Sequence, residues 1–239
     1  MDKTDSQWRR FGELDPYFGV LSHKRFHKER LTDQSIAEFF RSGEEDISRT
    51  FDFIRFKVDP NFAPKRSLDF GCGVGRLLPA LATRSEAVVG YDISPGMLAE
   101  ARKNCTAANI SLSPSIEGQF DFIHSRLVFQ HIAPRRGEKI LADLLKHLRG
   151  VGAIHFTYRS RHSLLGKWAR FLRRLAPFPL NGLWNLAQGR SFSYPWMRLS
   201  VYNLSRVLAV LRDAGCHAIQ VLPCDQGAMD GCIFFFKHD

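Results

Sequence analysis

Between residues 65 and 158, short apolar runs alternate with segments whose apolar residues recur at helical spacing. The runs predict strands at "RSLDFG", "AVVGYD", "FDFIHS" and "GAIHFTY". The segments between them predict helices at "RLLPALATR", "SPGMLAEARKNC" and "PRRGEKILADLLKHL". In the second helix, Ser94 stands at the N-cap and Pro95 at the first helical position. This alternation indicates a parallel sheet with helices on both faces.

The first 60 residues depart from this alternation. Their apolar residues follow helical or irregular spacing, and Asp33 or Ser35 is the expected N-cap of a helix through "IAEFF". Pro60 and Pro64 then mark a boundary. We therefore expect an N-terminal helical cap over residues 1–60.

The main domain, expected over residues 61–239, is interrupted by an insert at about residues 159–202. Helical spacing resumes near Asn203 and ends at Gly215, a residue type favoured at helix C-termini. "HAIQVLP" and "GCIFFFK" then predict two strands around a turn-rich segment, an antiparallel hairpin at the end of the sheet. The expected fold class is α/β, with a doubly wound and mostly parallel sheet.

The 34 Lys and Arg residues exceed the 24 Asp and Glu residues, which gives a net charge of +10. Such an excess favours anionic partners: nucleic acid, lipid headgroups or phosphorylated small molecules. It is concentrated at residues 22–30 and 159–174, where a solvated basic surface is the simpler interpretation.

Five cysteines form no C-x-x-C pair, which argues against a disulfide framework and against a zinc site. No stretch approaches the roughly eighteen consecutive apolar residues of a membrane span, and the start "MDKTDSQWRR" is more polar than a secretory signal. We therefore expect a cytoplasmic protein with reduced thiols and no metal. The sequence does not predict an oligomeric state.

The stretch "LDFGCGVGR" places three glycines, Gly71, Gly73 and Gly75, directly after the first predicted strand. Open α/β sheets bind ligands at the carboxyl ends of such strands, and a turn without Cβ atoms lets a nucleotide lie against the main chain. The spacing is G-x-G-x-G, which differs from the G-x-G-x-x-G of dinucleotide sites. Asp92 ends the second strand, and its two carboxylate oxygens can accept hydrogen bonds from both hydroxyls of a ribose.

These motifs, with "VVGYDIS", "FDFIHSRLVFQHI" and "VGAIHFTY", resemble the class I S-adenosylmethionine-dependent methyltransferases. The resemblance covers about residues 65–158 and 204–239 and implies a Rossmann-like, seven-stranded sheet with S-adenosyl-L-methionine as the cofactor. It implies that Asp69 orients the amino-acid moiety, that Asp92 holds the ribose, and that Ile93 and Met97 flank the adenine. The implied cofactor-binding set is Asp69, Gly71, Cys72, Gly73, Gly75, Arg76, Asp92, Ile93, Met97, Ser125 and Arg126.

The N-terminal "WRRFGELDPYFGVL" resembles the leader of a bacterial subgroup of these enzymes, in which helices and an aromatic residue cover the cofactor. Tyr17 and Phe18 are therefore candidate lid residues, or alternatively apolar anchors of the leader. In many family members, an acidic residue in the loop after the third strand contacts the adenine amino group; the corresponding segment here is "ISLSPSIEGQFD". Here only Glu117 stands there, and main chain near Ser115 or Ile116 is the alternative contact.

A sulfonium methyl group is already activated, so the protein has to align the acceptor, exclude water and remove a proton where the acceptor carries one. His131, just beyond the fourth strand, is the candidate base, with packing or cofactor contact as the alternative. His155, on a buried strand, is expected to be structural. Tyr158 and Arg159 are candidate substrate contacts at the end of the fifth strand.

The predicted function is methyl transfer to a small-molecule acceptor, anionic or lipid-linked. A basic amphipathic segment at residues 162–175 suggests contact with a membrane surface, or else a helix packed on the core. One alternative is an NAD(P)-dependent oxidoreductase, which the glycine spacing and the absence of a Tyr-x-x-x-Lys pair disfavour. The other is a non-catalytic protein that binds nucleic acid or membrane. "HSRL" replaces the "NPPY"-like motif of nucleic-acid methyltransferases, which makes a nucleic-acid substrate unlikely.

Overall fold

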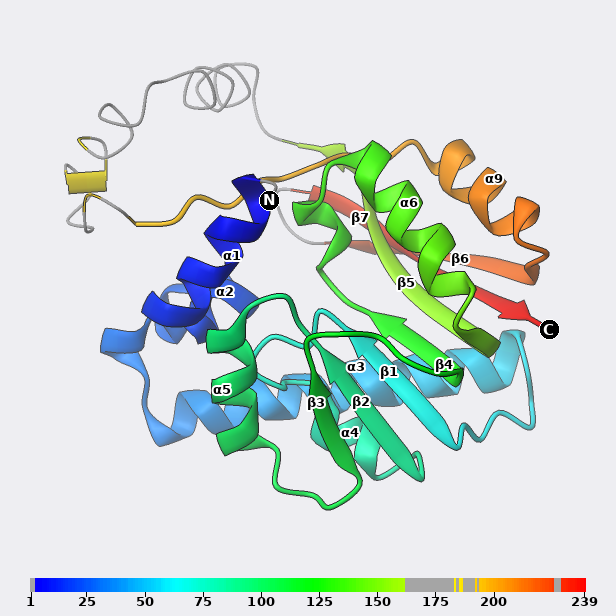
Figure 1. Cartoon of the computed structure of the whole chain (residues 1–239), viewed down its shortest axis with the longest axis horizontal. Helices are drawn as coiled ribbons and strands as arrows, with labels where there is room; N and C mark the ends of the chain where they lie inside the picture. Colours follow the sequence, from blue (N-terminus) through cyan, green and yellow to red (C-terminus); the bar gives the residue numbers. More distant parts are fainter. Residues whose placement is uncertain (1–2, 162–182, 184, 187–191, 193, 226–228) are drawn as a thin grey trace.

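Figure 1 shows a computed structural model of the chain, in which residues 3–161, 183, 185–186, 192, 194–225 and 229–239 are described. Its centre is a seven-stranded sheet with the order β3-β2-β1-β4-β5-β7-β6. The strands are β1 (Arg66–Phe70), β2 (Ala87–Tyr91), β3 (Ile110–Ser113), β4 (Phe120–Ser125), β5 (Leu148–Ser160), β6 (His217–Asp225) and β7 (Met229–His238). The first five strands pair in parallel, whereas β7 runs antiparallel to both β5 and β6. The predicted Rossmann-like fold class is confirmed.

Helices cover both faces of the sheet (Figure 1). One face carries α6 (Pro134–Leu145) and α9 (Leu204–Asp213), and the other carries α3 (Asp33–Lys57) and α4 (Leu78–Ala82). Along β7, Phe234 and Phe236 join the core under α6, while Phe235 joins the core under α3. Successive side chains of a strand point to opposite faces, so a continuous apolar strand can serve two cores at once.

The N-terminus of α3 is capped by Thr32, and the expectation of Asp33 or Ser35 as N-cap is wrong. The Thr32 hydroxyl accepts a hydrogen bond from the Ser35 amide at 3.2 Å, and the Thr32 amide donates to the Ser35 hydroxyl at 2.9 Å. This reciprocal pair satisfies two amide groups of the first turn. Ser35 therefore occupies the third helical position of a capping box.

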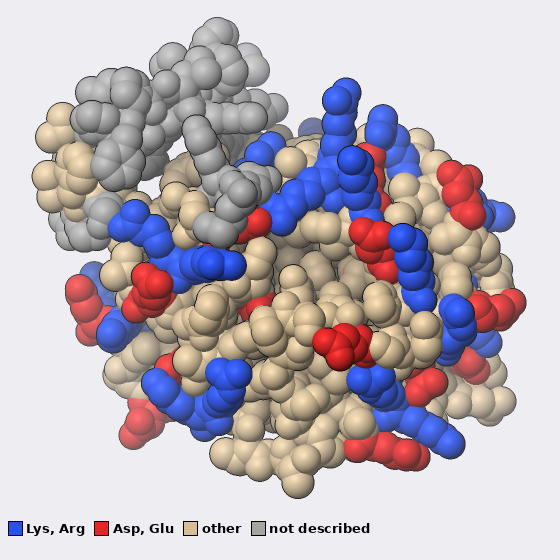
Figure 2. Space-filling view, viewed as in Figure 1, with Lys and Arg blue, Asp and Glu red and all other residues tan. Residues whose placement is uncertain are grey.

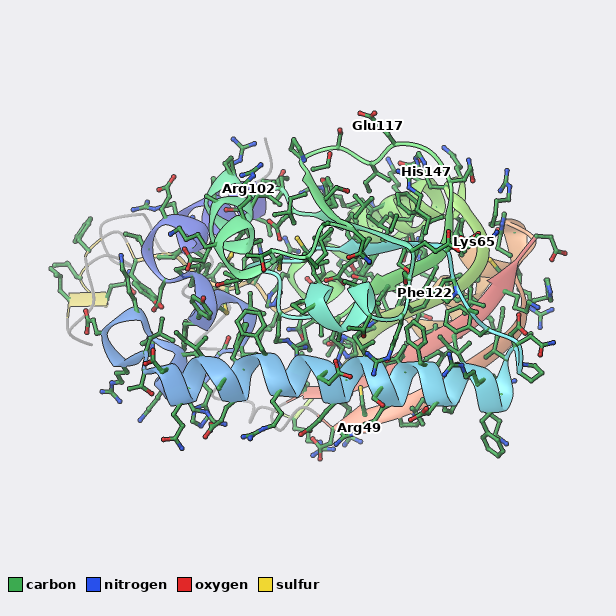
Figure 3. The ribbon with its side chains drawn as sticks, turned by 90° about the horizontal axis from the view of Figure 1, so that it is seen from below. Arg49, Lys65, Arg102, Glu117, Phe122 and His147 are labelled. Atoms are coloured by element: carbon green, nitrogen blue, oxygen red, sulfur yellow. The ribbon has the colours of Figure 1, made fainter. Side chains whose placement is uncertain are left out.

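The long helix α3 packs against the sheet, although its residues were expected in the N-terminal cap. Ile47, Phe51 and Ile54 are fully or almost fully buried with Phe122 of β4. Figure 3 shows α3 running along this face, with Phe122 between the helix and the strands. The boundary at residue 60 stays a prediction, but the part of the leader that lies over the ends of the strands is α1 (Lys3–Leu14) and α2 (Pro16–Val20).

Two glycines bring α1 into backbone contact with the start of α5 (Pro95–Asn104). A Cβ on Gly12 would lie 2.2 Å from the Ser94 hydroxyl oxygen and 2.8 Å from the Met97 amide nitrogen. A Cβ on Gly96 would lie 2.7 Å from the Gly12 carbonyl oxygen. Such distances are below any van der Waals contact, so only glycine at these positions lets the two helices approach this closely.

Residues 194–202, the return segment, are the last part of the expected insert and connect the cap to β5. The Tyr194 hydroxyl donates to Asp15 Oδ2 at 2.9 Å, and the Trp196 amide donates to Gln7 Oε1 at 2.8 Å. At its other end, the Tyr202 amide donates to the carbonyl of Thr157 on β5 at 2.7 Å. The basic segment 162–175 lies outside the described residues. No helix in the described ranges has the length and apolar character needed to cross a membrane.

Candidate active site

The turn after β1 holds three glycines in left-handed backbone conformations. The angle φ is +79° at Gly71, +55° at Gly73 and +87° at Gly75, a region that L side chains rarely adopt. The amides of Gly71 and Cys72 donate to the Tyr91 carbonyl at 2.8 and 2.9 Å, which ties the turn to the end of β2. The conformation of the turn therefore requires the glycines. Because glycine has no side chain, backbone atoms of the turn border the cavity.

Asp92 follows β2 and completes the turn from the side. Its Oδ2 accepts from the Gly73 amide at 2.9 Å, and its Oδ1 accepts from the Ser94 amide at 2.9 Å. Each oxygen keeps a further lone pair that can accept from a ribose hydroxyl. Burial raises the pKa of Asp92 to about 6, because desolvation of the carboxylate outweighs the backbone hydrogen bonds that stabilise its charged form.

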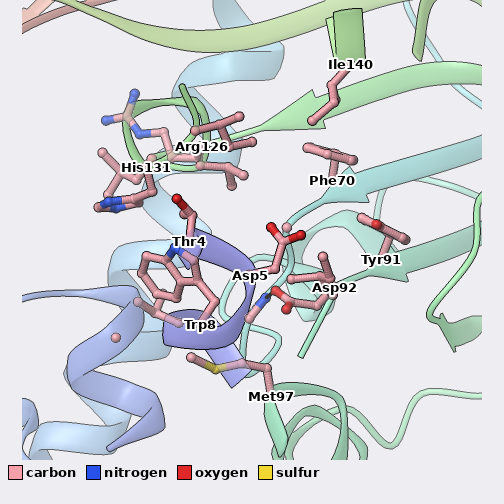
Figure 4. Close-up of a pocket in the computed structure, with 18 of the residues that line it drawn as sticks. Thr4, Asp5, Trp8, Phe70, Tyr91, Asp92, Met97, Arg126, His131 and Ile140 are labelled. Carbon is pink, nitrogen blue, oxygen red and sulfur yellow. Dashed lines mark hydrogen bonds between the residues drawn. The ribbon is translucent and has the colours of Figure 1, made fainter. Parts of the chain in front are cut away.

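A cavity lies over this turn, between the cap and α6 (Figure 4). The ends of β1 and β2 and the start of α5 form its floor, with Phe70, Gly71, Gly73, Tyr91, Asp92, Ile93 and Met97. The loop after β4 and the helix α6 form a wall, with Arg126, Leu127, Val128, His131, Ile132, Arg136 and Ile140. The cap closes it with Thr4, Asp5, Trp8, Gly19 and Val20.

The cavity brings together seven of the residues predicted from the sequence. These are Gly71, Gly73, Asp92, Ile93, Met97, Arg126 and His131. Three separate stretches of the chain contribute them: the glycine turn, the segment from the end of β2 to the start of α5, and the loop after β4. Their convergence at the carboxyl ends of β1, β2 and β4 is the arrangement expected of a ligand site in an open α/β sheet.

Asp69 and Ser125 do not line the cavity and instead support it from behind. Asp69 is buried, and its Oδ1 lies 3.0 Å from His124 Nδ1 on β4. The Ser125 hydroxyl donates to the Phe70 carbonyl at 3.0 Å, which joins β4 to the last residue of β1. Asp69 points to the α3 face because it alternates with Leu68 and Phe70, whose side chains lie in the core under α6.

Cys72, Gly75 and Arg76 also lie outside the cavity. Cys72 is buried in the core under α3. Arg76 donates to Asp46 of α3 at 2.8 Å and to the Ser42 hydroxyl at 3.1 Å. The Cys72 and Arg76 side chains face α3, and the role of these three residues in cofactor binding stays a prediction.

Tyr17 and Phe18, the expected lid residues, do not line the cavity. The Tyr17 hydroxyl donates to Asn104 Oδ1 at 3.0 Å, and Phe18 stacks on His27 with ring centroids 3.8 Å apart. These contacts correspond to the alternative, in which the two residues anchor the leader. The residues that close the cavity come from the preceding helix, α1, and from Gly19 and Val20.

Tyr158 and Arg159 lie within β5 rather than at its end, because the strand continues to Ser160. Both side chains are exposed, and Arg159 pairs with Asp230 of β7 at 3.7 Å, outside the cavity. His155 on the same strand is fully buried, as expected of a structural residue.

The residues considered for adenine after the third strand lie outside the cavity. Glu117 is exposed and accepts from the Ser115 hydroxyl at 2.9 Å. Figure 3 places it at the edge of the molecule opposite α3. Neither Ser115 nor Ile116 lines the cavity, so the main-chain alternative for adenine stays a prediction.

Both ring nitrogens of His131 are occupied. Its Nδ1 donates to the Arg198 carbonyl of the return segment at 2.7 Å. Its Nε2 accepts from the Gln130 side-chain amide at 3.0 Å, and the Gln130 oxygen accepts from the Thr157 hydroxyl at 3.3 Å. Burial lowers the pKa of His131 to about 4, since the charged imidazolium would lose its solvation. These contacts favour a positioning role over the candidate role as general base.

Asp5, Trp8 and Arg136 are among the cavity residues that were not anticipated. Arg136 Nη1 and Nη2 donate to the two carboxylate oxygens of Asp5 at 2.6 and 3.0 Å, which links α6 to α1. The Trp8 ring lies 4.7 Å from the His131 ring. Asp5 and Trp8 are three residues apart, so they share one side of a helix, but nothing in the sequence shows which side meets the cavity.

Among the described residues, no group of three or more His, Cys, Asp or Glu side chains could hold a metal ion. The five cysteines are all free thiols.

Residues 68–152 match a family of methyltransferase domains. The chain is 37% identical to trans-aconitate 2-methyltransferase of Methylobacterium nodulans over 75 residues, 30% of this chain and 28% of that protein. It is 26% identical to an uncharacterised methyltransferase of Synechocystis over 127 residues, 51% of this chain and 60% of that protein. The matches therefore span less than two thirds of the curated relatives.

Two solved structures share the fold along the whole chain. Magnesium protoporphyrin IX methyltransferase from Synechocystis, with bound S-adenosylhomocysteine, aligns with a TM-score of 0.67 and 15% identity and covers 100% of both chains. The N-methyltransferase NodS from Bradyrhizobium japonicum, also with bound S-adenosylhomocysteine, aligns with a TM-score of 0.57 and 15% identity over 99% of both chains. Residues 68–152, which carry the G-x-G-x-G turn and Asp92, therefore match methyltransferase domains, and the chain has the fold of two methyltransferases solved with bound S-adenosylhomocysteine.

Proposed function

We propose that this protein transfers a methyl group from S-adenosyl-L-methionine to a small, anionic acceptor. The observation that carries the proposal is the glycine turn with Asp92 beside it on the floor of a capped cavity. A Cβ on Gly71 would lie 2.4 Å from the Val128 side chain, so the turn needs glycine on the side that faces the wall. The residues fit a nucleoside ligand, with main chain on one side and a carboxylate for its ribose.

The residues of the cavity would have separate roles in binding the cofactor, excluding water and positioning the acceptor. Gly71, Gly73 and Asp92 would hold the cofactor, and Ile93 and Met97 would flank its adenine. When bound, the cofactor supplies a methyl group on a positively charged sulfur. The cap would exclude water through Trp8 and Val20, and the loop after β4 would position the acceptor.

The charge of the chain supports an anionic acceptor. Two arginines line the cavity wall, and α6 begins with "PRR". In Figure 2, Lys and Arg side chains gather around the upper side of the recess at the centre of this face. The relative from Methylobacterium is named for trans-aconitate, an anion, which is consistent with this acceptor class. We infer a cytoplasmic location from the free cysteines.

Isothermal calorimetry with S-adenosylmethionine and with NAD tests the proposal. We expect binding of S-adenosylmethionine and none of NAD, because the turn has the methyltransferase glycine spacing. Binding of NAD alone would support the oxidoreductase alternative and refute the proposal. Salt-dependent binding of RNA or anionic vesicles without any cofactor would instead support the non-catalytic alternative.

A further inference from the structure

We propose that the methyl acceptor is a carboxylate, held by Arg126, and that the product is a methyl ester. This inference rests on the proposed methyltransferase function and narrows its acceptor class. Two independent observations carry it: a cation in the cavity wall whose charge is only partly balanced, and the absence of a proton acceptor from the described residues that line the cavity.

The two arginines of the wall differ in their partners. Arg136 forms a two-point ion pair with Asp5, so its charge is balanced. Among the described residues, the ion-pair partner of Arg126 is Asp46, at 3.6 Å, and Arg126 also interacts with the Cys224 thiol. Asp46 already accepts a hydrogen bond from Arg76 at 2.8 Å. The Arg126 Nε is buried and has no hydrogen-bond partner among the described residues. Two guanidinium groups thus share one carboxylate, and a second carboxylate beside Arg126 would balance the charge.

Arg126 also lies on the side of the cavity where an acceptor is needed. It follows β4, and in Figure 4 it is drawn next to His131, across the cavity from Tyr91, Asp92 and Met97. Asp92 is expected to hold the ribose of the cofactor, which leaves the opposite side of the cavity, at Arg126, for the acceptor. A carboxylate bound there would face the cofactor from the wall formed by the loop after β4.

The titratable side chains that line the cavity offer no base for a protonated acceptor. Besides the arginines, they are Asp5, Tyr91, Asp92 and His131 among the described residues. Asp5 is paired with Arg136, and Asp92 accepts two backbone hydrogen bonds. The two nitrogens of His131 are held by Arg198 and Gln130. Burial raises the pKa of Tyr91, which keeps its hydroxyl protonated.

A carboxylate needs no such base. Alcohols, phenols and ammonium groups must lose a proton to become a neutral methylated product, whereas a carboxylate is already ionised at neutral pH. One carboxylate oxygen forms the new bond to the methyl carbon with its own electron pair, and the methyl–sulfur bond breaks with its pair on sulfur. The negative and positive charges cancel, so a neutral ester and a thioether form and no proton is released.

The stability of the transferred methyl group to alkali tests this inference. The protein is incubated with methyl-labelled S-adenosylmethionine and the small-molecule fraction of a cell extract, and the labelled product is treated with mild alkali. We expect the label to be released as volatile methanol, because esters hydrolyse under these conditions. A label that stays non-volatile marks an ether or an N-methyl group and would overturn the carboxylate assignment, while leaving the proposed methyltransferase function intact. Failure to bind S-adenosylmethionine in calorimetry would refute the proposed function itself.

Arg126→Gln and Arg126→Lys test the residue. We expect Arg126→Gln to lower ester formation about tenfold or more through the KM of the acceptor, with the Kd of S-adenosylmethionine within about twofold of wild type. Arg126→Lys keeps the charge and should restore part of the loss. Arg135→Gln, at an exposed neighbour on α6, is the matched control. Equal effects of Arg126→Gln and Arg135→Gln, or a loss confined to S-adenosylmethionine binding, would contradict the assignment. Circular dichroism of each variant reports whether it is folded.

Discussion

The floor of the cavity and its cap are built in different ways. The centre of the floor is the turn from Gly71 to Gly75, whose glycines adopt left-handed conformations and whose amides donate hydrogen bonds to the end of β2. The cap is held by side chains and close helix contacts between residues far apart in the chain, such as Gly12 with Gly96 and Asp5 with Arg136. The conformation of the floor is therefore specified by residues close together in the sequence, whereas the position of the cap depends on the packing of separate elements. A change in the floor should therefore abolish binding, and a change in the cap should only weaken it.

Gly73→Val is expected to have the largest effect, because it breaks the floor. The new side chain would stand at φ +55° and its Cβ would meet Val20 at 2.5 Å. We expect the affinity for S-adenosylmethionine in calorimetry to fall more than about a hundredfold, with the far-ultraviolet circular dichroism unchanged. Gly215→Val is the matched control, since Gly215 also has a positive φ but no atom within 4 Å of its Cβ position. Wild-type affinity in Gly73→Val would refute the assigned floor.

Asp92→Ala is expected to cost about 1–3 kcal/mol of cofactor binding, since it leaves two ribose hydroxyls unpaired in a buried site. Calorimetry measures the loss, and Asp92→Asn separates charge from shape because it keeps one acceptor oxygen. Asp143→Ala, at an exposed carboxylate on α6, serves as the control. If Asp92→Ala bound the cofactor as tightly as wild type, the role given to the end of β2 would be wrong.

Lowering the pH should weaken cofactor binding at the floor without any mutation. The pKa of Asp92 is raised to about 6 by burial, and hydrogen bonds donated by a ribose stabilise the ionised form. Cofactor affinity should therefore rise with pH up to about 6 and then level off, with about a tenfold difference between pH 5 and pH 7. His131, with a pKa of about 4, stays neutral across this range. Calorimetry at both pH values measures the difference, which should vanish in Asp92→Asn; a difference that persists there would assign the titration to another group.

Gly12→Val should have the smallest effect on cofactor affinity, because it displaces only the cap. The new side chain would collide with Ser94 and with the Met97 amide, so α1 would move away from α5. We expect about a fivefold loss of cofactor affinity, the equivalent of roughly 40 Å² of lost apolar contact. Glu13→Val, at an exposed neighbour on α1, is the control. A loss as large as that in Gly73→Val would show that the cap, not the floor, dominates binding.

The same contrast between local and long-range structure separates what the sequence could predict from what it could not. The alternation from residue 65 onward predicted the fold class and six of the seven strands, since burial on two faces leaves a regular apolar pattern; the short strand β3 was not among them. Ser94 and Pro95 predicted the start of α5, because capping is a local effect. The sequence left Tyr17 and Phe18 as either lid residues or anchors of the leader, and in the structure their side chains contact Asn104 and His27. Sequence spacing could not reveal this, because the direction of a short helix depends on what it packs against.

The sequence by itself determined the floor of this site: the strand that leads into the turn, the glycines that the turn requires, and Asp92 directly after β2. Each of these follows from backbone conformation within a few residues or from the period of a strand. Only the tertiary structure decided which groups close the site and which can act in it. Trp8, Asp5 and Arg136 reach the cavity through helix packing. The return segment and Gln130 occupy both nitrogens of His131, because residues 67 positions apart, His131 and Arg198, become neighbours only in the folded chain.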